Sequence, residues 1–131
     1  MGVRFTPQQS GSFLQVSGLS FEIDLSVPSG CQSDEMGMYA GIEGERRIKN
    51  VKVNGEDIVS DQMYTLASSD YILTQNGDGY TMFDGATILQ DAAKLDNQVL
   101  IDFITEYLGG VIAEEYENPY GQGRINILNG E

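Results

Sequence analysis

The sequence Asn-Gly-Asp-Gly at residues 76–79 places one carboxylate, that of Asp78, in a tight loop. A carboxylate there can bind a cation or accept charge-assisted hydrogen bonds from a ligand, and the glycines on either side allow close approach of the backbone. The stretch does not fit a calcium loop of the EF-hand type, because Gly85 stands where that loop requires a bidentate Glu. By pattern alone, Asp78 is a turn residue.

Composition excludes several kinds of chemistry. The 131 residues include no His, which removes His-dependent catalytic triads and zinc sites of the Cys/His type. The lone Cys31 excludes an intrachain disulfide, and its polar surroundings favour a spectator thiol over a nucleophile. A net charge of −13 disfavours a nucleic-acid partner. No stretch has the length of a membrane span, and the first ten residues lack the apolar core of a signal peptide.

Period-two alternation of apolar residues predicts one bent strand, or two collinear strands, over Phe13–Leu25, with a bulge at Ser17-Gly18 where the parity changes. The dipeptide Asn54-Gly55 predicts a hairpin turn of type I′. Further strands are expected at 46–53, 63–69 and 124–128.

Two glycine-rich stretches, Pro28–Glu45 and Asp70–Gly85, are predicted as loops, the second with one helical turn at its start. The clearest helix begins with Asp96 as its N-cap and ends at Gly109-Gly110. Its apolar stripe, expected in the core, is Val99, Leu100, Phe103, Ile104, Tyr107 and Leu108. The fold class is therefore α+β: a mixed or antiparallel sheet with one main C-terminal helix packed on it.

Several segments, in their order and spacing, resemble the C-terminal substrate-binding domain of the 5′-nucleotidase family. They read FLQVSGLSFEIDL, IKNVKVNGEDI, MYTLASSDY, NGDGYTMF and GRINIL. The resemblance covers about residues 11–128. It implies a hydrolase of two domains that removes phosphate from nucleotides. Catalysis would reside in an N-terminal metallophosphoesterase domain that holds divalent metals through Asp, His and Asn, and this chain alone would have no activity and no metal or cofactor of its own.

Carried over residue by residue, the resemblance assigns Phe13 to one stacking wall for a nucleoside base and Asp78 to the ribose hydroxyls. Asn76, Gly77 and Gly79 shape the loop around the sugar, although the family usually has glycine at position 76. The assignment of the second aromatic wall is less direct. Tyr71 lies one residue further from Asp78 than the family's aromatic usually does, and position 72 is Ile. Either Tyr71 serves after a one-residue insertion, or the base is stacked on one side only. By pattern alone, Phe13 is a core residue.

The resemblance also carries expectations about organisation. Residues 1–10 are interpreted as an N-terminal tail, native or added for expression, and residues 11–131 as a domain that lacks the family's upstream segment. An uncovered strand edge and apolar face would then favour a homodimer. The parent protein is expected outside the cell, in the periplasm or at the cell surface, with a nucleoside or nucleotide as substrate. The alternative is a stand-alone acidic interaction or dimerisation module that keeps the fold without binding the ligand.

Overall fold

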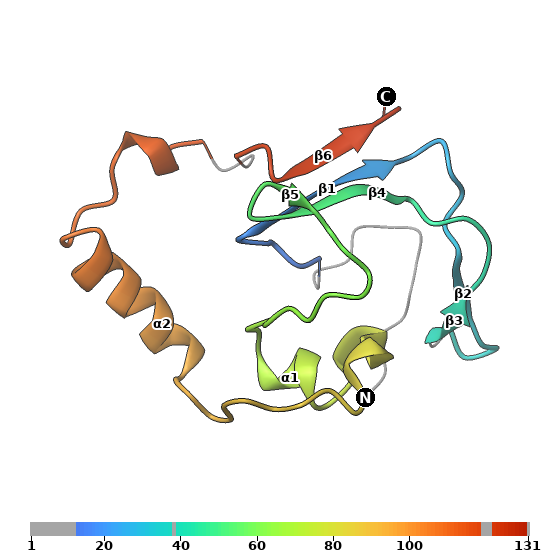
Figure 1. The fold of residues 1–131 in the computed structure, drawn as a ribbon, viewed down its shortest axis with the longest axis horizontal. Coiled ribbons are helices and arrows are strands. Elements are labelled where there is room, and N and C mark those ends of the chain that lie inside the picture. Colours follow the sequence, from blue (N-terminus) through green and yellow to red (C-terminus); the bar gives the residue numbers. More distant parts are fainter. Residues whose placement is uncertain (1–12, 38, 119–121, 131) are drawn as a thin grey trace. The chain divides into compact units, whose positions relative to one another are not determined.

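A computed structural model describes residues 13–37, 39–118 and 122–130, so the predicted tail at 1–10 lies outside the described residues. The chain divides into two compact units, residues 1–65 with 121–131 and residues 66–120, and each is described by itself. The first unit carries the strands and the second carries the helices (Figure 1).

The first unit contains a four-stranded sheet (Figure 1), in the order β5-β4-β1-β6. Its strands are β1 (Leu19–Asp24), β4 (Ile48–Val53), β5 (Glu56–Asp57) and β6 (Ile125–Leu128). β1 pairs antiparallel with β4 and parallel with β6, and β4 pairs antiparallel with β5. The sheet is therefore mixed, and with the main helix of the second unit the fold class is α+β, as predicted.

The β4–β5 hairpin confirms the Asn54-Gly55 prediction. Both residues have positive φ, 51° and 88°, as a type I′ turn requires. The same turn limits β1: pairing with β4 ends at Leu19 opposite Val53, and the Asn54 amide donates to the Gly18 carbonyl at 2.8 Å. The predicted strand over Phe13–Leu25 is therefore wrong for its first part, because β4 reverses before it can pair with residues 13–17.

The bulge also lies elsewhere than predicted. Between Ser20 and Glu22 the pairing shifts by one residue on β4, where Asn50 adopts a φ of 50°. The extra residue thus belongs to β4 and not to Ser17-Gly18. Asparagine tolerates this left-handed conformation better than other residues with a β-carbon.

The stretch Pro28–Glu45, predicted as a loop, contains the antiparallel pair β2 (Cys31–Ser33) and β3 (Tyr39–Ile42). Its reversal is a turn at Asp34, whose carboxylate accepts from the Met36 amide at 2.9 Å and whose carbonyl accepts from the Gly37 amide at 2.9 Å. The predicted strand at 63–69 is also wrong. These residues are exposed and lie outside the strands, which shows that β propensity without a partner strand is insufficient.

The second unit contains α1 (Asp70–Leu73), short 3-10 turns at Gly77–Gly79, Thr81–Phe83 and Glu114–Tyr116, and the main helix. That helix is α2 (Asp96–Asp102), which continues as a wider π turn over Phe103–Tyr107. Leu95 and not Asp96 is at its N-cap position, and the Asp96 carboxylate accepts from the Asn97 amide at 2.7 Å. Within the described residues, no helix has the length and apolar character needed to cross a membrane.

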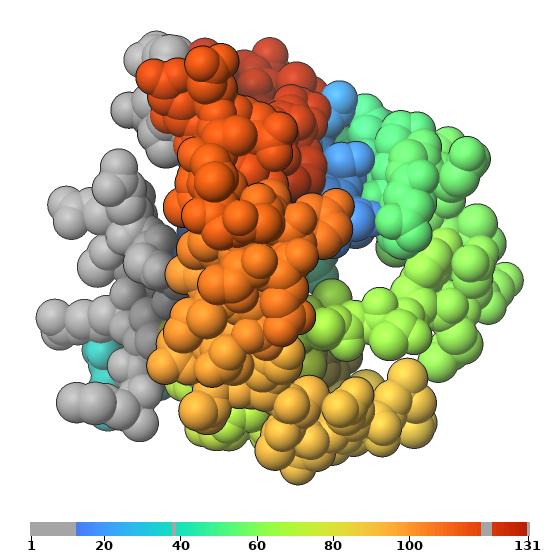
Figure 2. Space-filling model, turned by 90° about the vertical axis from the view of Figure 1, so that its left-hand side faces the viewer, coloured from blue at the N-terminus to red at the C-terminus, as the bar shows by residue number. Residues whose placement is uncertain are grey.

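The apolar stripe of this helix does not lie in the core, contrary to the prediction: Ile104 and Leu108 are half-buried, and the other four residues of the stripe are exposed. The exposed fractions are 54% for Val99, 59% for Leu100 and 78% for Tyr107. Part of this helix surface is open to view in Figure 2 (orange). Among the described residues, only Val27 and Ile72 are buried apolar side chains.

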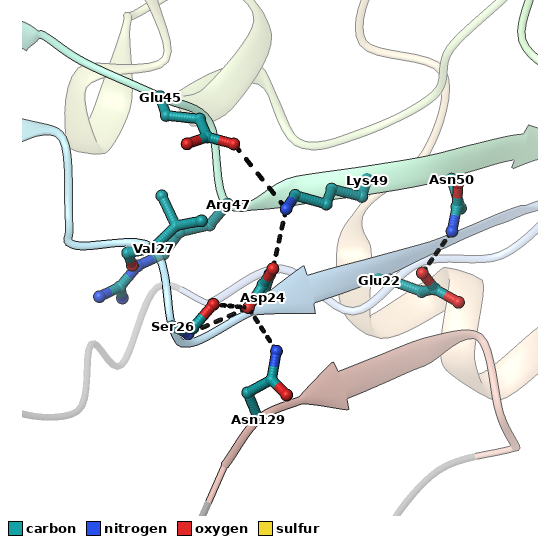
Figure 3. Close-up of polar contacts among 9 residues, drawn as sticks. All are labelled: Glu22, Asp24, Ser26, Val27, Glu45, Arg47, Lys49, Asn50 and Asn129. Carbon is teal, nitrogen blue, oxygen red and sulfur yellow. Dashed lines mark hydrogen bonds and ion pairs between the residues drawn. The ribbon is translucent and has the colours of Figure 1, made fainter.

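A buried carboxylate joins three parts of the first unit (Figure 3). Asp24, 8% exposed at the end of β1, accepts hydrogen bonds from Lys49 of β4 at 2.8 Å and from Asn129, just after β6, at 2.8 Å. The Ser26 hydroxyl and amide donate to it at 2.6 and 3.0 Å. These four residues are called the Asp24 cluster below. Hydrogen bonds from Lys49, then Ser26, then Asn129 lower the pKa of Asp24 well below its ordinary value of 3.8.

We expect Asp24→Asn to lower the Tm at pH 7, because the amide cannot pair with Lys49 and accepts fewer hydrogen bonds. The matched control is Asp57→Asn, which removes the 2.6 Å pair between Lys52 and the 84% exposed Asp57. An exposed pair contributes little, so its loss should lower the Tm less. Thermal unfolding followed by circular dichroism measures both shifts.

The effect of Asp24→Asn depends on pH in a defined direction. Because the folded pKa lies below the unfolded value of about 3.9, the carboxylate contributes its full stability above about pH 5 and loses it as pH falls further. The difference in Tm between the wild type and Asp24→Asn should therefore shrink below about pH 4. A difference that stays constant down to pH 2 would contradict this role for the Asp24 charge.

Candidate nucleoside-binding loop

Helix α1 is a single turn built around Asp70. The Asp70 carboxylate accepts from the Tyr71 amide at 2.9 Å and from the Gln75 side chain at 2.9 Å, and its carbonyl accepts from the Thr74 amide at 2.9 Å. This turn buries Ile72, which is 4% exposed, and leaves Tyr71 43% exposed. Of these two neighbours, Tyr71 therefore presents its side chain at the surface.

The segment after α1 forms a 3-10 turn over Gly77–Gly79, called the GDG turn below. Asn76 and Asp78 have φ angles of 52° and 54°, in the left-handed region. Asn and Asp are the residues with a β-carbon that occupy this region most readily. The Gly79 amide donates to the Asn76 carbonyl at 3.2 Å and the Tyr80 amide to the Gly77 carbonyl at 3.1 Å.

Tyr71 contacts the GDG turn in two ways. Its hydroxyl donates to Oδ1 of Asp78 at 3.0 Å. Its ring lies against Gly77, where a β-carbon would come within 2.4 to 2.5 Å of three ring atoms. Position 77 therefore accepts only glycine as long as the Tyr71 ring stays in place. Together these contacts set the Tyr71 ring and the Asp78 carboxylate side by side.

The charge of Asp78 acts on two tyrosines. The hydrogen bond to Asp78, followed by desolvation, raises the pKa of Tyr71 above its ordinary value of 10.0. Desolvation, followed by the negative charge of Asp78, raises the pKa of Tyr80. Both hydroxyls therefore keep their protons at physiological pH. Tyr80 is a neighbour of the carboxylate that the sequence analysis missed, although its place directly after Gly-Asp-Gly is a signal that could have found it.

One polar atom of the loop is unusual. The side-chain oxygen Oδ1 of Asn76 is buried and has no hydrogen-bond partner among the residues described. A buried acceptor without a partner costs free energy, commonly about 1–3 kcal/mol. The left-handed backbone at Asn76 is therefore retained despite an unfavourable side-chain environment.

The predicted site residues fall into two groups. Tyr71, Asn76, Gly77, Asp78 and Gly79 all lie in the second unit, within one short segment. Phe13 belongs to the first unit, precedes β1 and is 52% exposed. This exposure disagrees with the interpretation of Phe13, by pattern alone, as a core residue. Across the described part of the chain, no three or more Cys, Asp or Glu side chains group as metal ligands, and the sequence contains no His.

We expect Gly77→Ala to displace the Tyr71 ring, because the added methyl group would overlap it. The hydrogen bond between Tyr71 and Asp78 should then be lost and the pKa of Tyr71 should fall toward 10. Ultraviolet titration of the tyrosines in Gly77→Ala measures this change. Subtracting the same titration of Gly77→Ala/Tyr71→Phe isolates the pKa of Tyr71. Gly85→Ala is the control, because its β-carbon meets open space at a φ of 78° and adds backbone strain only. A Tyr71 pKa equal to the wild-type value in Gly77→Ala would contradict the contact.

Comparison with known proteins places these motifs in a family. The family model described as "5'-nucleotidase, C-terminal domain" matches residues 4–85, which include β1 to β5, α1 and the GDG turn. A 5′-nucleotidase of Diplobatis ommata is 25% identical over 104 residues, covering 79% of this chain. The chain spans only 17% of that relative's length. No solved structure gives a significant match. The chain belongs to the family of 5′-nucleotidase C-terminal domains.

Proposed function

We propose that this chain binds the nucleoside part of a nucleotide on behalf of a 5′-nucleotidase-like hydrolase. In this proposal Phe13 and Tyr71 are the stacking walls for the base, and Asp78 accepts hydrogen bonds from the ribose hydroxyls. The backbone of Asn76, Gly77 and Gly79 shapes the loop around the sugar. The substrate class is a nucleoside or nucleotide.

The observation that carries the proposal is the geometry of Tyr71 beside Asp78. A base needs a flat apolar ring, and a ribose needs an acceptor next to it that is charged at neutral pH. Tyr71 is 43% exposed and its hydroxyl lies 3.0 Å from Oδ1 of Asp78, so both residues are available within one short segment. No described residue donates a hydrogen bond to Oδ2 of Asp78. The burial of Ile72 favours Tyr71 over position 72 as the second wall.

In the whole protein, phosphate release would take place in an N-terminal metallophosphoesterase domain. Divalent metals there would activate water and stabilise the displaced phosphate. This chain has no His to contribute to such a centre. Its part in the reaction is to hold the nucleoside so that the phosphate reaches those metals. The parent protein would act outside the cytoplasm, on extracellular or periplasmic nucleotides.

Asp78→Ala should weaken the binding of adenosine to the 131-residue chain by about 10-fold or more, because a charged acceptor for the ribose is lost. Phe13→Ala should weaken it by about 5-fold or more, since a stacked base is worth roughly 1–3 kcal/mol. Isothermal titration calorimetry with adenosine and AMP measures both. Asp84→Ala is the matched control, because it removes an exposed carboxylate just beyond the GDG turn.

The result that would contradict the proposal is equal affinity for adenosine in the wild type and in Asp78→Ala. In the full-length protein, the corresponding result would be a KM for AMP that Asp78→Ala leaves unchanged. Retained binding in Asp84→Ala would exclude a general effect of lowering the net negative charge.

A second candidate function is an interaction or dimerisation module. It is favoured by the exposed apolar side chains of α2 and of the π turn that follows it, such as Leu100 and Tyr107. The net charge of −13 opposes self-association at low salt, since like charges repel. A dimer that buries the α2 stripe should therefore form more readily as salt screens this charge.

Sedimentation velocity over a range of concentrations tests this second candidate. The module hypothesis predicts a monomer–dimer equilibrium that Leu100→Glu shifts toward the monomer. Asn97→Glu, on the same helix but outside the apolar stripe, is the control for added charge. A monomer at all concentrations, together with saturable binding of adenosine, would contradict the module hypothesis.

A further inference from the structure

We propose that the hydroxyl of Tyr71 is a positioning group that orients the Asp78 carboxylate for a ribose, so that the loop prefers nucleosides to free bases. This inference rests on the proposed function and adds a separate role for the hydroxyl group of Tyr71. The ring of Tyr71 would contact the base, while its hydroxyl would act on the sugar only through Asp78.

The Asp78 carboxylate needs a support from outside its own turn. It lies at a left-handed φ of 54° in a short turn, and its side chain is partly exposed. A short aspartate in such a turn has several rotamers open to it. The 3.0 Å hydrogen bond from the Tyr71 hydroxyl to Oδ1 selects one of them. Holding an acceptor in its binding orientation before the ligand arrives reduces the entropy lost on binding.

Tyr71 is itself held firmly enough to act as this support. Its amide is bound to the Asp70 carboxylate at 2.9 Å in α1, and its ring lies against Gly77 so closely that a β-carbon there would overlap it. The backbone and the ring of Tyr71 are thus each held by one contact, which restricts where its hydroxyl can lie. Because Gly77 directly precedes Asp78, the same close contact sets the distance between the ring and the carboxylate.

The two oxygens of the Asp78 carboxylate have different surroundings. Oδ1 is occupied by Tyr71, whereas Oδ2 receives no hydrogen bond from any residue the structure describes. An ionised carboxylate has acceptor capacity on both oxygens. The tyrosine hydroxyl stays protonated at neutral pH, as the raised pKa of Tyr71 indicates, so it keeps donating to Oδ1 and leaves Oδ2 for the sugar. Free adenine lacks the ribose hydroxyls that would donate to this oxygen in the nucleoside.

Titration of the full 131-residue chain with adenosine and with adenine separates the two tasks of Tyr71. Tyr71→Phe keeps the ring and its contact with Gly77 and removes only the hydroxyl. It should weaken adenosine binding by about 3- to 10-fold, the loss of one ordinary hydrogen bond, and leave adenine binding unchanged. Tyr71→Ala removes the ring as well and should weaken the binding of both ligands. The ratio of the two affinities is a readout that a purely structural role would not change.

The possible results of these titrations distinguish failure of the inference from failure of the proposed function. Equal or tighter adenosine binding by Tyr71→Phe would overturn the inference, because the hydroxyl would then compete with the ribose. An equal loss for adenosine and adenine would also overturn it, since the hydroxyl would then support the loop as a whole. If Asp78→Ala binds adenosine as the wild type does, or if the wild type shows no saturable binding, the proposed function itself fails and the inference with it. Loss in Asp78→Ala without loss in Tyr71→Phe would remove the inference alone.

Discussion

The ionised side chain of Asp24 is the constraint on which the sheet depends. A carboxylate that is only 8% exposed must be paired and hydrogen-bonded to be tolerated inside a protein. Its partners come from β4, from the residues after β1, and from Asn129 at the end of β6. Because Asn129 is far from Asp24 in sequence, the Asp24 cluster links the residues after β6 to the end of β1, the strand that lies between β4 and β6. The family match ends at residue 85, so the parallel pairing of β6 and this last hydrogen bond come from the part of the chain beyond it.

The candidate nucleoside-binding loop, residues 70–80, depends on short-range contacts instead. All of its geometry arises between Asp70 and Tyr80, where the one-turn helix α1 sets the position of Tyr71 and two left-handed residues turn the chain back toward it. The close approach of Gly77 to the Tyr71 ring joins the two elements. A site of this kind can keep its geometry with few buried apolar residues nearby, and Ile72 is the one buried apolar side chain among the described residues of this unit.

The sequence predicts those elements whose signals are local. The Asn54-Gly55 turn requires positive φ at both positions, and the structure has it. The 3.6-residue period correctly predicts a helix from Asp96, but it predicts burial wrongly, because burial depends on what faces the stripe. The strand expected at 63–69 fails for a similar reason, since no strand pairs with it in the described residues. In the GDG turn segment, the residue type at position 76 is enough to predict the left-handed backbone conformation, because asparagine tolerates it. The hydrogen bond from Tyr71 to Asp78 depends on how α1 is oriented relative to the GDG turn. Residue types alone do not predict that orientation.

The central claim is that the GDG turn and Phe13 bind a nucleoside, and residue-resolved NMR tests it most directly. Amide spectra of the ¹⁵N-labelled chain would be recorded during titration with adenosine, and with ribose 5-phosphate as a ligand that lacks a base. The account predicts saturable shifts with adenosine at Gly77, Asp78, Gly79 and Phe13, with one common affinity. It predicts that ribose 5-phosphate shifts the GDG turn alone. Shifts confined to α2, or no shifts at the GDG turn at any adenosine concentration, would contradict it.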